Sequence, residues 1–277
     1  KQLILTQMRL PRLVLGILIG ALLATSGVVV QSVFLNPLAD PYIIGIASAA
    51  TFGAVIAYLL GLSDVFYGIF AFLSASALSI VIFKLAAHTR SISTLLIVGI
   101  AVSSFLGAFT SFAVYLIGVD SFRITAWMMG YLGGANWQKI ALLLPPLLFC
   151  MAYFYAKRHE LNIILNGDEE AKSLGLNVEK SKKSLLIVSS LIIGFSVAFT
   201  GMIGFVGLII PHTLRMALHT ASNAVLIPAS ALTGGVFLVF CDVIAKNALS
   251  PVEIPIGVVT SFFGAPFFLY LAFRKHA

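Results

Sequence analysis

A stretch of apolar and small residues over 13–33, with one glutamine near its end, constrains this chain more than any other feature. A helix needs about 20 such residues to cross the ~30 Å hydrocarbon core of a bilayer. Further runs of similar length follow, and none alternates with the period of two expected for barrel strands. Of the 277 residues, 60% are hydrophobic and 10% are charged, and the mean hydropathy is +1.07. These values exclude an ordinary soluble domain. The sequence predicts an all-α, polytopic membrane helical bundle.

The apolar runs predict nine spans in one transmembrane domain that covers residues 1–277. Two of the spans, 184–200 and 203–218, leave almost no room for a loop between them. Short segments interrupted by glycine often mark broken or re-entrant helices in transporters. The predicted spans are 13–33, 43–61, 65–86, 94–117, 138–156, 184–200, 203–218, 222–246 and 255–273.

The 17 lysines and arginines lie mainly between the spans, which is a topology signal of membrane proteins rather than a sign of nucleic-acid binding. A cytoplasmic C-terminus places most of them inside. It also places Lys1 outside, so a further span is expected before residue 1, giving about ten spans with both ends inside. The basic residues expected outside are Lys1, Arg9, Arg12, Arg123, Lys139 and Lys246.

Two arginines flank Leu10-Pro11 at the outer end of the first span. Arg9 and Arg12 suit either a docking surface for a partner or interfacial anchoring by snorkelling. Lys246 has the same two interpretations, because Asp242 lies four residues earlier on the same helix face and can neutralise it.

The longest polar stretch, 157–183, lies on the predicted cytoplasmic side. Within it, the sequence around Asp168 predicts a short amphipathic helix, capped by Asn166 or Asp168 and ended by Gly175. Acidic residues in its first turn favour that helix. The stretch is either a solvated connector or a docking knob for a cytoplasmic partner.

Five motifs, in this order, resemble those of the permease subunits of type II ABC importers, which bring in cobalamin, haem and ferric siderophores. The resemblance covers essentially the whole chain. The motifs are Arg9–Arg12 with Gly20–Gly27, Gln31 and Asn36–Pro41; Gly167–Gly175; Gly204–His212; Glu253–Gly257; and Gly264–Phe268.

The resemblance implies a homodimer in a bacterial or archaeal cytoplasmic (inner) membrane, with two cytoplasmic ATP-binding cassette subunits and an external substrate-binding protein. It implies transport rather than catalysis, so no catalytic residue, metal or cofactor is expected on this chain. The sequence contains no P-loop of the form G-x-x-x-x-G-K-[ST], which fits ATP and magnesium being held by the partner ATPase.

The resemblance also assigns site residues. Docking of the binding protein falls to Arg9, Arg12 and Lys246, where lysine replaces the arginine usual in the cobalamin permease and loses its bidentate fork. Ser93 and Thr94 are candidates for the inner gate, with helix capping as the alternative. ATPase coupling falls to a segment of about 161–180, namely Gly167, Asp168, Glu169, Glu170, Ala171, Lys172, Leu174 and Gly175.

Other functions fit less well. A stand-alone secondary transporter or channel predicts inverted repeats and a midplane ionisable residue, and a membrane enzyme predicts clustered histidines or acids. The sequence shows neither pattern, and His212 is expected to be packed rather than a metal ligand. Cys150 and Cys241 lie in apolar segments and predict no disulfide. Trp127 and Trp137 predict an aromatic belt around a short interfacial helix within 118–138.

Overall fold

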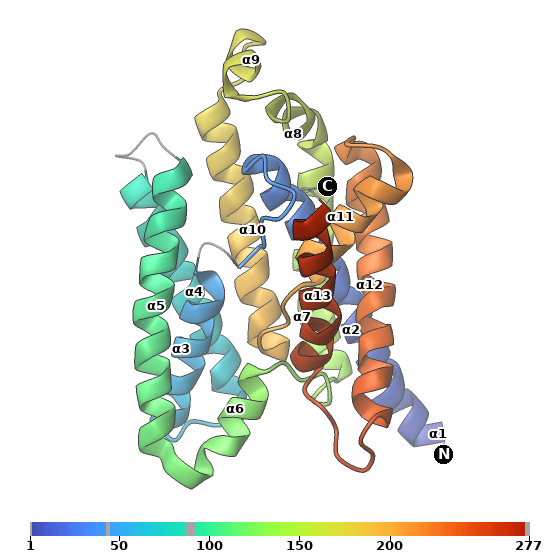
Figure 1. Ribbon diagram of the computed structural model, residues 1–277. Helices are drawn as coiled ribbons and strands as arrows, with labels where there is room; N and C mark the ends of the chain where they lie inside the picture. Colours follow the sequence, from blue (N-terminus) through green and yellow to red (C-terminus); the bar gives the residue numbers. More distant parts are fainter. Residues whose placement is uncertain (1, 43–44, 87–91, 275–277) are drawn as a thin grey trace.

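The computed structural model describes residues 2–42, 45–86 and 92–274. In this part of the chain the secondary structure is helical, without strands, which confirms the predicted fold class. The helices run up and down through the bundle, as Figure 1 shows. The short helices α8 (Arg158–Ile164) and α9 (Asp168–Ser173) lie at one end, while the N-terminus and α6 (Phe122–Met128) lie at the other.

Each predicted span corresponds to one helix. Five helices of the described residues are long and apolar enough to cross a membrane, and the apolar parts of the other four have 10–17 residues. The nine helices are α2 (Leu10–Val33), α3 (Ile46–Leu59), α4 (Asp64–Ala86), α5 (Ile92–Ile117), α7 (Trp137–Ala156), α10 (Val178–Thr200), α11 (Val206–Leu218), α12 (Asn223–Asn247) and α13 (Ile256–Arg274). Short elements complete the described chain: α1 (Gln2–Ile4), a π-helical turn (Leu5–Arg9) and a 3₁₀ turn (Gly118–Ser121).

Two predicted boundaries need correction. Helix α10 begins at Val178 rather than near residue 184, so Lys180 and Lys182 lie inside the helix. Helix α11 begins only at Val206, after a non-helical break at 201–205. Its 13 residues span about 20 Å, which is short of the ~30 Å apolar core. The predicted interruption between these two spans is therefore present in the backbone.

Helix α2 is the centre of the bundle, with 83% of its most apolar window buried, and α12 runs antiparallel beside it. Glycines allow the two backbones to touch. A methyl group added at Gly20 would lie 2.2 Å from the carbonyl oxygen of Gly234, which only glycine permits. Small residues that allow such close approach are the usual basis of helix association in membranes. The α2–α12 pair is therefore a tightly packed unit.

Substituting Gly20 with alanine should separate α2 from α12. We expect a loss of about 1–3 kcal/mol in the free energy of unfolding, because the obstacle is backbone that cannot rotate away. Gly107, in α5, is the matched control: nothing lies within 4 Å of a methyl group added there. Gly107→Ala should be neutral or slightly stabilising. Thermal unfolding in detergent checks both, and equal stabilities would contradict the packing argument.

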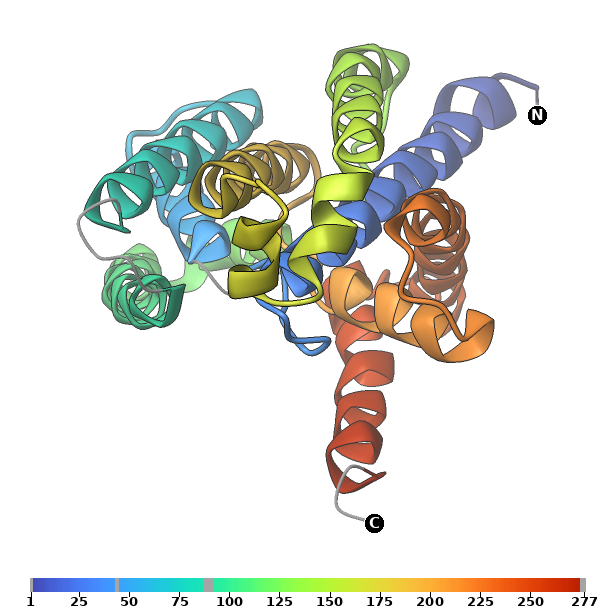
Figure 2. The ribbon, with the colours of Figure 1, turned by 90° about the horizontal axis from the view of Figure 1, so that it is seen from above.

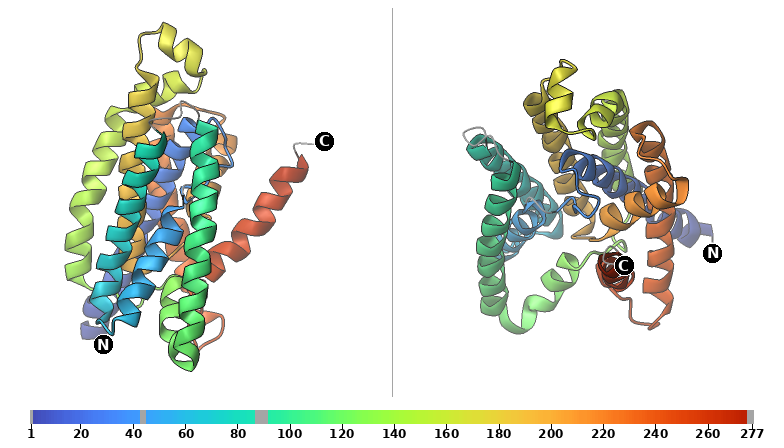
Figure 3. Two further views of the ribbon diagram at one scale, coloured as in Figure 1. Left: turned by 90° about the vertical axis from the view of Figure 1, so that its left-hand side faces the viewer. Right: turned by 45° about the horizontal axis from the view of Figure 1, so that its top comes forward.

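Helices α5 and α13 lie at the periphery. Seen from above, α13 extends away from the other helices and α5 lies at an edge (Figure 2). The side view in Figure 3 shows the same outward tilt of α13. Only 11% of the apolar window of α5 is buried, and Phe262 and Phe273 of α13 are largely exposed. Both helices therefore have large apolar surfaces that the other described helices of the subunit do not cover.

Candidate functional site

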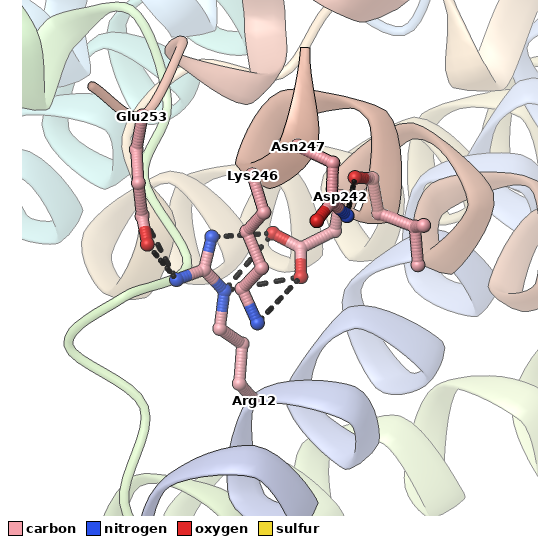
Figure 4. A network of polar contacts seen from close by, with 6 residues as sticks. Arg12, Asp242, Lys246, Asn247 and Glu253 are labelled. Atoms are coloured by element: carbon pink, nitrogen blue, oxygen red, sulfur yellow. Dashed lines mark hydrogen bonds and ion pairs between the residues drawn. The ribbon is translucent and has the colours of Figure 1, made fainter. Parts of the chain in front are cut away.

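Four charged side chains meet at the end of the bundle opposite α9 (Figure 4). Arg12 lies in the first turn of α2, and Asp242 and Lys246 lie near the end of α12. Glu253 comes from the segment that leads into α13. The antiparallel course of α2 and α12 brings the beginning of one to the end of the other. Residues separated by more than 200 positions thus form one cluster.

Arg12 holds this cluster together. Its Nε donates to both carboxylate oxygens of Asp242 at 3.0 Å, and its Nη2 donates to Asp242 Oδ1 at 2.8 Å. Its Nη1 donates to both oxygens of Glu253, at 3.1 and 2.9 Å. Lys246 Nζ lies 3.5 Å from Asp242 Oδ2. Two cations and two anions therefore balance in a site where Arg12 is only 8% exposed.

Docking of a partner had an alternative at each of the three basic residues at this end of the bundle: snorkelling for Arg9 and Arg12, and local pairing for Lys246. The snorkelling interpretation is wrong for Arg12, because its guanidinium is buried between α2 and α12. The pairing of Lys246 with Asp242 is confirmed. Arg9 is exposed at the end of the π-helical turn. Docking of a binding protein by these three basic residues stays a prediction. Sequence reasoning gave no role to Glu253 beyond its motif.

At the opposite end, α9 is attached by one small side chain and one ion pair. Ala171 is fully buried, and Lys182 of α10 pairs with Asp168 at 2.5 Å. Glu169 and Glu170, in the first turn of α9, are exposed. Lys172 of the same helix is exposed as well, so α9 presents two carboxylates and one ammonium group to its surroundings.

The predicted cap of α9 is wrong, while its predicted end is confirmed. The N-cap is Gly167, which has no side chain, and no side-chain hydrogen bond caps the helix. Asp168 is instead the first helical residue and uses its carboxylate for Lys182. Gly175 ends the helix with φ +84°, and its N–H donates to the carbonyl of Lys172. That left-handed conformation favours glycine.

Helix α8 is also tied to α10. Glu160 accepts hydrogen bonds from Lys157 and from the hydroxyl of Ser181. Partial burial raises the pKa of Glu160, but these two hydrogen bonds outweigh it and leave the pKa below its ordinary value. The same contact raises the pKa of Lys157. Both groups are therefore charged at neutral pH, and α8, α9 and α10 are joined by charge-assisted contacts.

The polar turn after α2 is built by its own side chains. Asn36 Oδ1 accepts from the N–H of Leu38 at 2.9 Å, and Asp40 Oδ1 accepts from the N–H of Tyr42 at 2.7 Å. Such turns are a common use of Asn and Asp. The hydroxyl of Tyr42 then donates to the carbonyl of Ile203, in the break before α11. The two irregular segments of the bundle thus support each other.

Gln31 makes polar contacts to α11 that the sequence alone did not predict. Its Nε2 donates to the carbonyls of Gly207 and Leu208, at 3.3 and 3.2 Å, in the first turn of α11. Its Oε1 accepts from Arg215 in the last turn of α11. A lone glutamine inside an apolar run was the available signal for such a contact.

The remaining candidates have simpler roles. Ser93 and Thr94 fall in the first turn of α5, but their side chains lie outside the described part of the structure, so their gating role stays a prediction. The ring of His212 packs edge-on against Phe267, with centroids 6.1 Å apart. Among the described residues, no group of three or more His, Cys, Asp or Glu could hold a metal ion.

The other sequence features are placed as follows. Cys150 and Cys241 are buried and free. Trp127 lies in α6, which is a short helix within the predicted range. Trp137 begins α7, and its ring N–H donates to the carbonyl of Thr6 at 2.9 Å.

Comparison with known proteins identifies the family of the chain. The FecCD transport family matches residues 1–274. The chain belongs to this family. It is 43% identical over 275 residues to the cobalamin import system permease protein BtuC of Halobacterium salinarum, covering 98% of this chain and 73% of that protein. It is 37% identical to the hemin transport system permease protein HmuU of Yersinia pestis, covering 96% and 82%.

A solved structure has the same fold. It is described as an inward-facing conformation of a metal-chelate type ABC transporter, and it matches with a TM-score of 0.91 at 33% identity. The match covers 99% of this chain and 88% of the other. The resemblance to permease subunits of type II ABC importers is thereby confirmed, and the chain is a multi-pass protein of the inner membrane.

Proposed function

We propose that this chain is the permease of an ATP-driven importer that passes a metal chelate, such as cobalamin, haem or a siderophore, from an external binding protein into the cytoplasm. The observation that carries the proposal is that charged side chains lie on elements at opposite ends of one bundle. Arg9 and Lys246 belong to the N-terminal turn and the end of α12 at one end, and the exposed charges of α9 lie at the other (Figure 1). A permease that acts between two partners needs a contact at each end.

The coupling segment supports an ATPase contact. Helix α9 projects from the bundle and is bound back to α10 through Asp168 and Lys182. A short helix held in this way moves with the span to which it is attached. The chain has no P-loop, so an ATP-driven importer built on it needs a separate ATPase, and we place its contact at this segment.

The peripheral helices support a homodimer. Exposed apolar side chains of α13, such as Phe262, and the poorly buried α5 offer surface that a second copy can cover. In a two-fold dimer, the interface is formed by the same surface patch of both subunits. We place the substrate path along that axis, where α5 carries small residues including Gly107. Ser93 and Thr94, at the cytoplasmic end of α5, remain the proposed gate.

A stand-alone secondary transporter is the competing function. Such a protein needs an ionisable group near the midplane. Asp242 and Glu253 lie instead at one end of the bundle and are bound to Arg12. This arrangement favours a structural role for both acids over ion coupling.

Co-expression with neighbouring genes tests the proposal. We expect the purified chain to retain an ATP-binding cassette subunit in a two-to-two complex, and the complex to hydrolyse ATP. Failure to retain any ATPase would contradict the proposal. A panel of cobalamin, haem, a ferric siderophore and an oxyanion, tested for binding to the partner binding protein, then identifies the substrate. Tight binding of an oxyanion alone would contradict the assignment to metal chelates.

A further inference from the structure

The segment formed by α8 and α9 has a second attachment to the bundle, and this one does not involve α10. Asn162, on α8, accepts two hydrogen bonds with its Oδ1: one from the backbone N–H of Asn223 at 2.8 Å and one from Asn223 Nδ2 at 2.9 Å. The hydroxyl of Ser32 donates to the carbonyl of Val28 at 2.8 Å and, at the longer distance of 3.2 Å, to Asn223 Oδ1. Asn223 and Ser32 are both fully buried. One chain of polar contacts therefore joins α8, the start of α12 and the end of α2.

This contact completes the start of α12. The first N–H groups of any helix lack partners within the helix. The N-cap residue Ser222 makes no side-chain hydrogen bond here, and Asn223 is the first residue of the helix. Asn162 supplies an acceptor from a different helix instead. The N–H of Asn223 thus keeps this acceptor only while α8 keeps its position.

The helices reached by this contact extend to the other end of the bundle. The α2–α12 pair is in backbone contact at Gly20 and Gly234 and is joined at its outer end by Arg12 and Asp242. Tightly packed elements of this kind move as rigid bodies rather than deforming gradually. A displacement of α8 at the inner end is therefore passed to the outer cluster.

We propose that Asn162 is the positioning residue through which movement of the α8–α9 segment reaches the α2–α12 pair and the outer charged cluster. The ion pair of Asp168 with Lys182 forms a separate connection, to α10. The proposal rests on the proposed function, because it assumes that an ATPase moves the segment. It assigns to one neutral side chain the polar link between the two proposed partner surfaces, beside the apolar packing of α8 on α2 and α12.

The hydrogen-bond pattern predicts an asymmetry between two similar substitutions. Asn162 acts only as an acceptor toward Asn223, so Asn162→Asp keeps both contacts. The added negative charge also lies at a helix N-terminus, where the helix dipole favours it. In contrast, Asn223→Asp replaces the donating Nδ2 with an oxygen that faces Asn162 Oδ1. Asn162→Leu keeps a similar size and removes the acceptor.

The test uses the permease assembled with its ATPase in nanodiscs, with and without the binding protein. We expect Asn162→Leu and Asn223→Asp to reduce the ratio of stimulated to basal ATP hydrolysis about tenfold, within the usual range of allosteric coupling. Asn162→Asp should keep the wild-type ratio. Hydrogen exchange on the permease alone should be about tenfold faster at the start of α12 in Asn162→Leu only, since that variant loses the acceptor for the helix N–H.

Thr220 provides the matched control. It lies just before α12 and outside the coupling segment, and its Oγ1 accepts from the N–H of Ser222 at 3.2 Å, a contact that stays within that loop. Thr220→Val keeps a similar shape and should keep the stimulation ratio. Wild-type stimulation in Asn162→Leu, or equal damage by Asn162→Asp or Thr220→Val, would overturn the proposal. A wild-type complex without any stimulation would instead defeat the proposed function, while the exchange result on the permease would stand.

Discussion

Replacing Arg12 with leucine should lower the free energy of unfolding by about 3–5 kcal/mol, the usual cost of leaving a buried charge without its partner. The substitution removes the three hydrogen bonds that Asp242 accepts from the guanidinium. Lys246, at 3.5 Å, remains as a weaker counter-charge. Thermal unfolding of the detergent-solubilised permease measures the loss.

Two companion variants test the cause. Arg12→Leu combined with Asp242→Leu should recover most of the lost stability, because the buried carboxylate is removed together with its partner, while Glu253 and Lys246, which also lose a contact, are more exposed than Asp242. Arg9→Leu removes the same side chain from an exposed position of the same segment and should change stability by less than about 0.5 kcal/mol. If Arg12→Leu is as stable as Arg9→Leu, the cluster does not hold α2 against α12.

The bundle could be predicted from sequence because hydrophobicity alone determines which segments enter a membrane. Each of the nine apolar runs is one helix, and the break near Gly201 was visible as a glycine-rich interruption. The start of α10 was missed for a related reason. Lys182 was counted as a loop residue, yet Asp168 neutralises it and allows it to be buried in the helix.

The candidate site could be predicted only where its contacts are local. Asp242 and Lys246 are four residues apart on one helix, so their pairing followed from the helical repeat. Arg12 and Asp242 are 230 positions apart, and nothing in either segment identifies the other. The resemblance to a family singled out Arg12 by motif, but it suggested an exposed docking role rather than a buried ion pair. Such a long-range pairing requires the packing of α2 on α12 to be known.

The burial of Arg12 changes how docking should be tested. Reversing its charge would place a third carboxylate beside Asp242 and Glu253, and the resulting loss of structure would be mistaken for a loss of docking. Arg9 is exposed, so its reversal probes docking without disturbing the cluster. Reversing the charge of Lys246 would affect both docking and stability, because its ammonium group is paired with Asp242.

Arg9→Glu should therefore weaken binding of the external binding protein by about 10- to 100-fold, since placing like charges opposite each other across an interface costs several kcal/mol. Lys246→Glu should have a smaller effect on docking and a measurable cost in stability. The effect of Arg9→Glu should shrink as salt is raised from about 0.05 to 0.5 M, because exposed charges are screened. Surface plasmon resonance with the permease in nanodiscs measures both dependences.

Lys183 provides the control for this experiment. It is exposed on α10, near the attachment of α9 at the opposite end of the bundle. Lys183→Glu makes the same change in net charge as Arg9→Glu. Because Lys183 lies at the opposite end of the bundle, the substitution should leave docking of the external protein unchanged. Equal weakening by Arg9→Glu and Lys183→Glu would mean that net charge alone governs the association. Unchanged binding by Arg9→Glu at low salt would reduce Arg9 to a lipid anchor, because a docking contact at this position cannot tolerate the reversed charge.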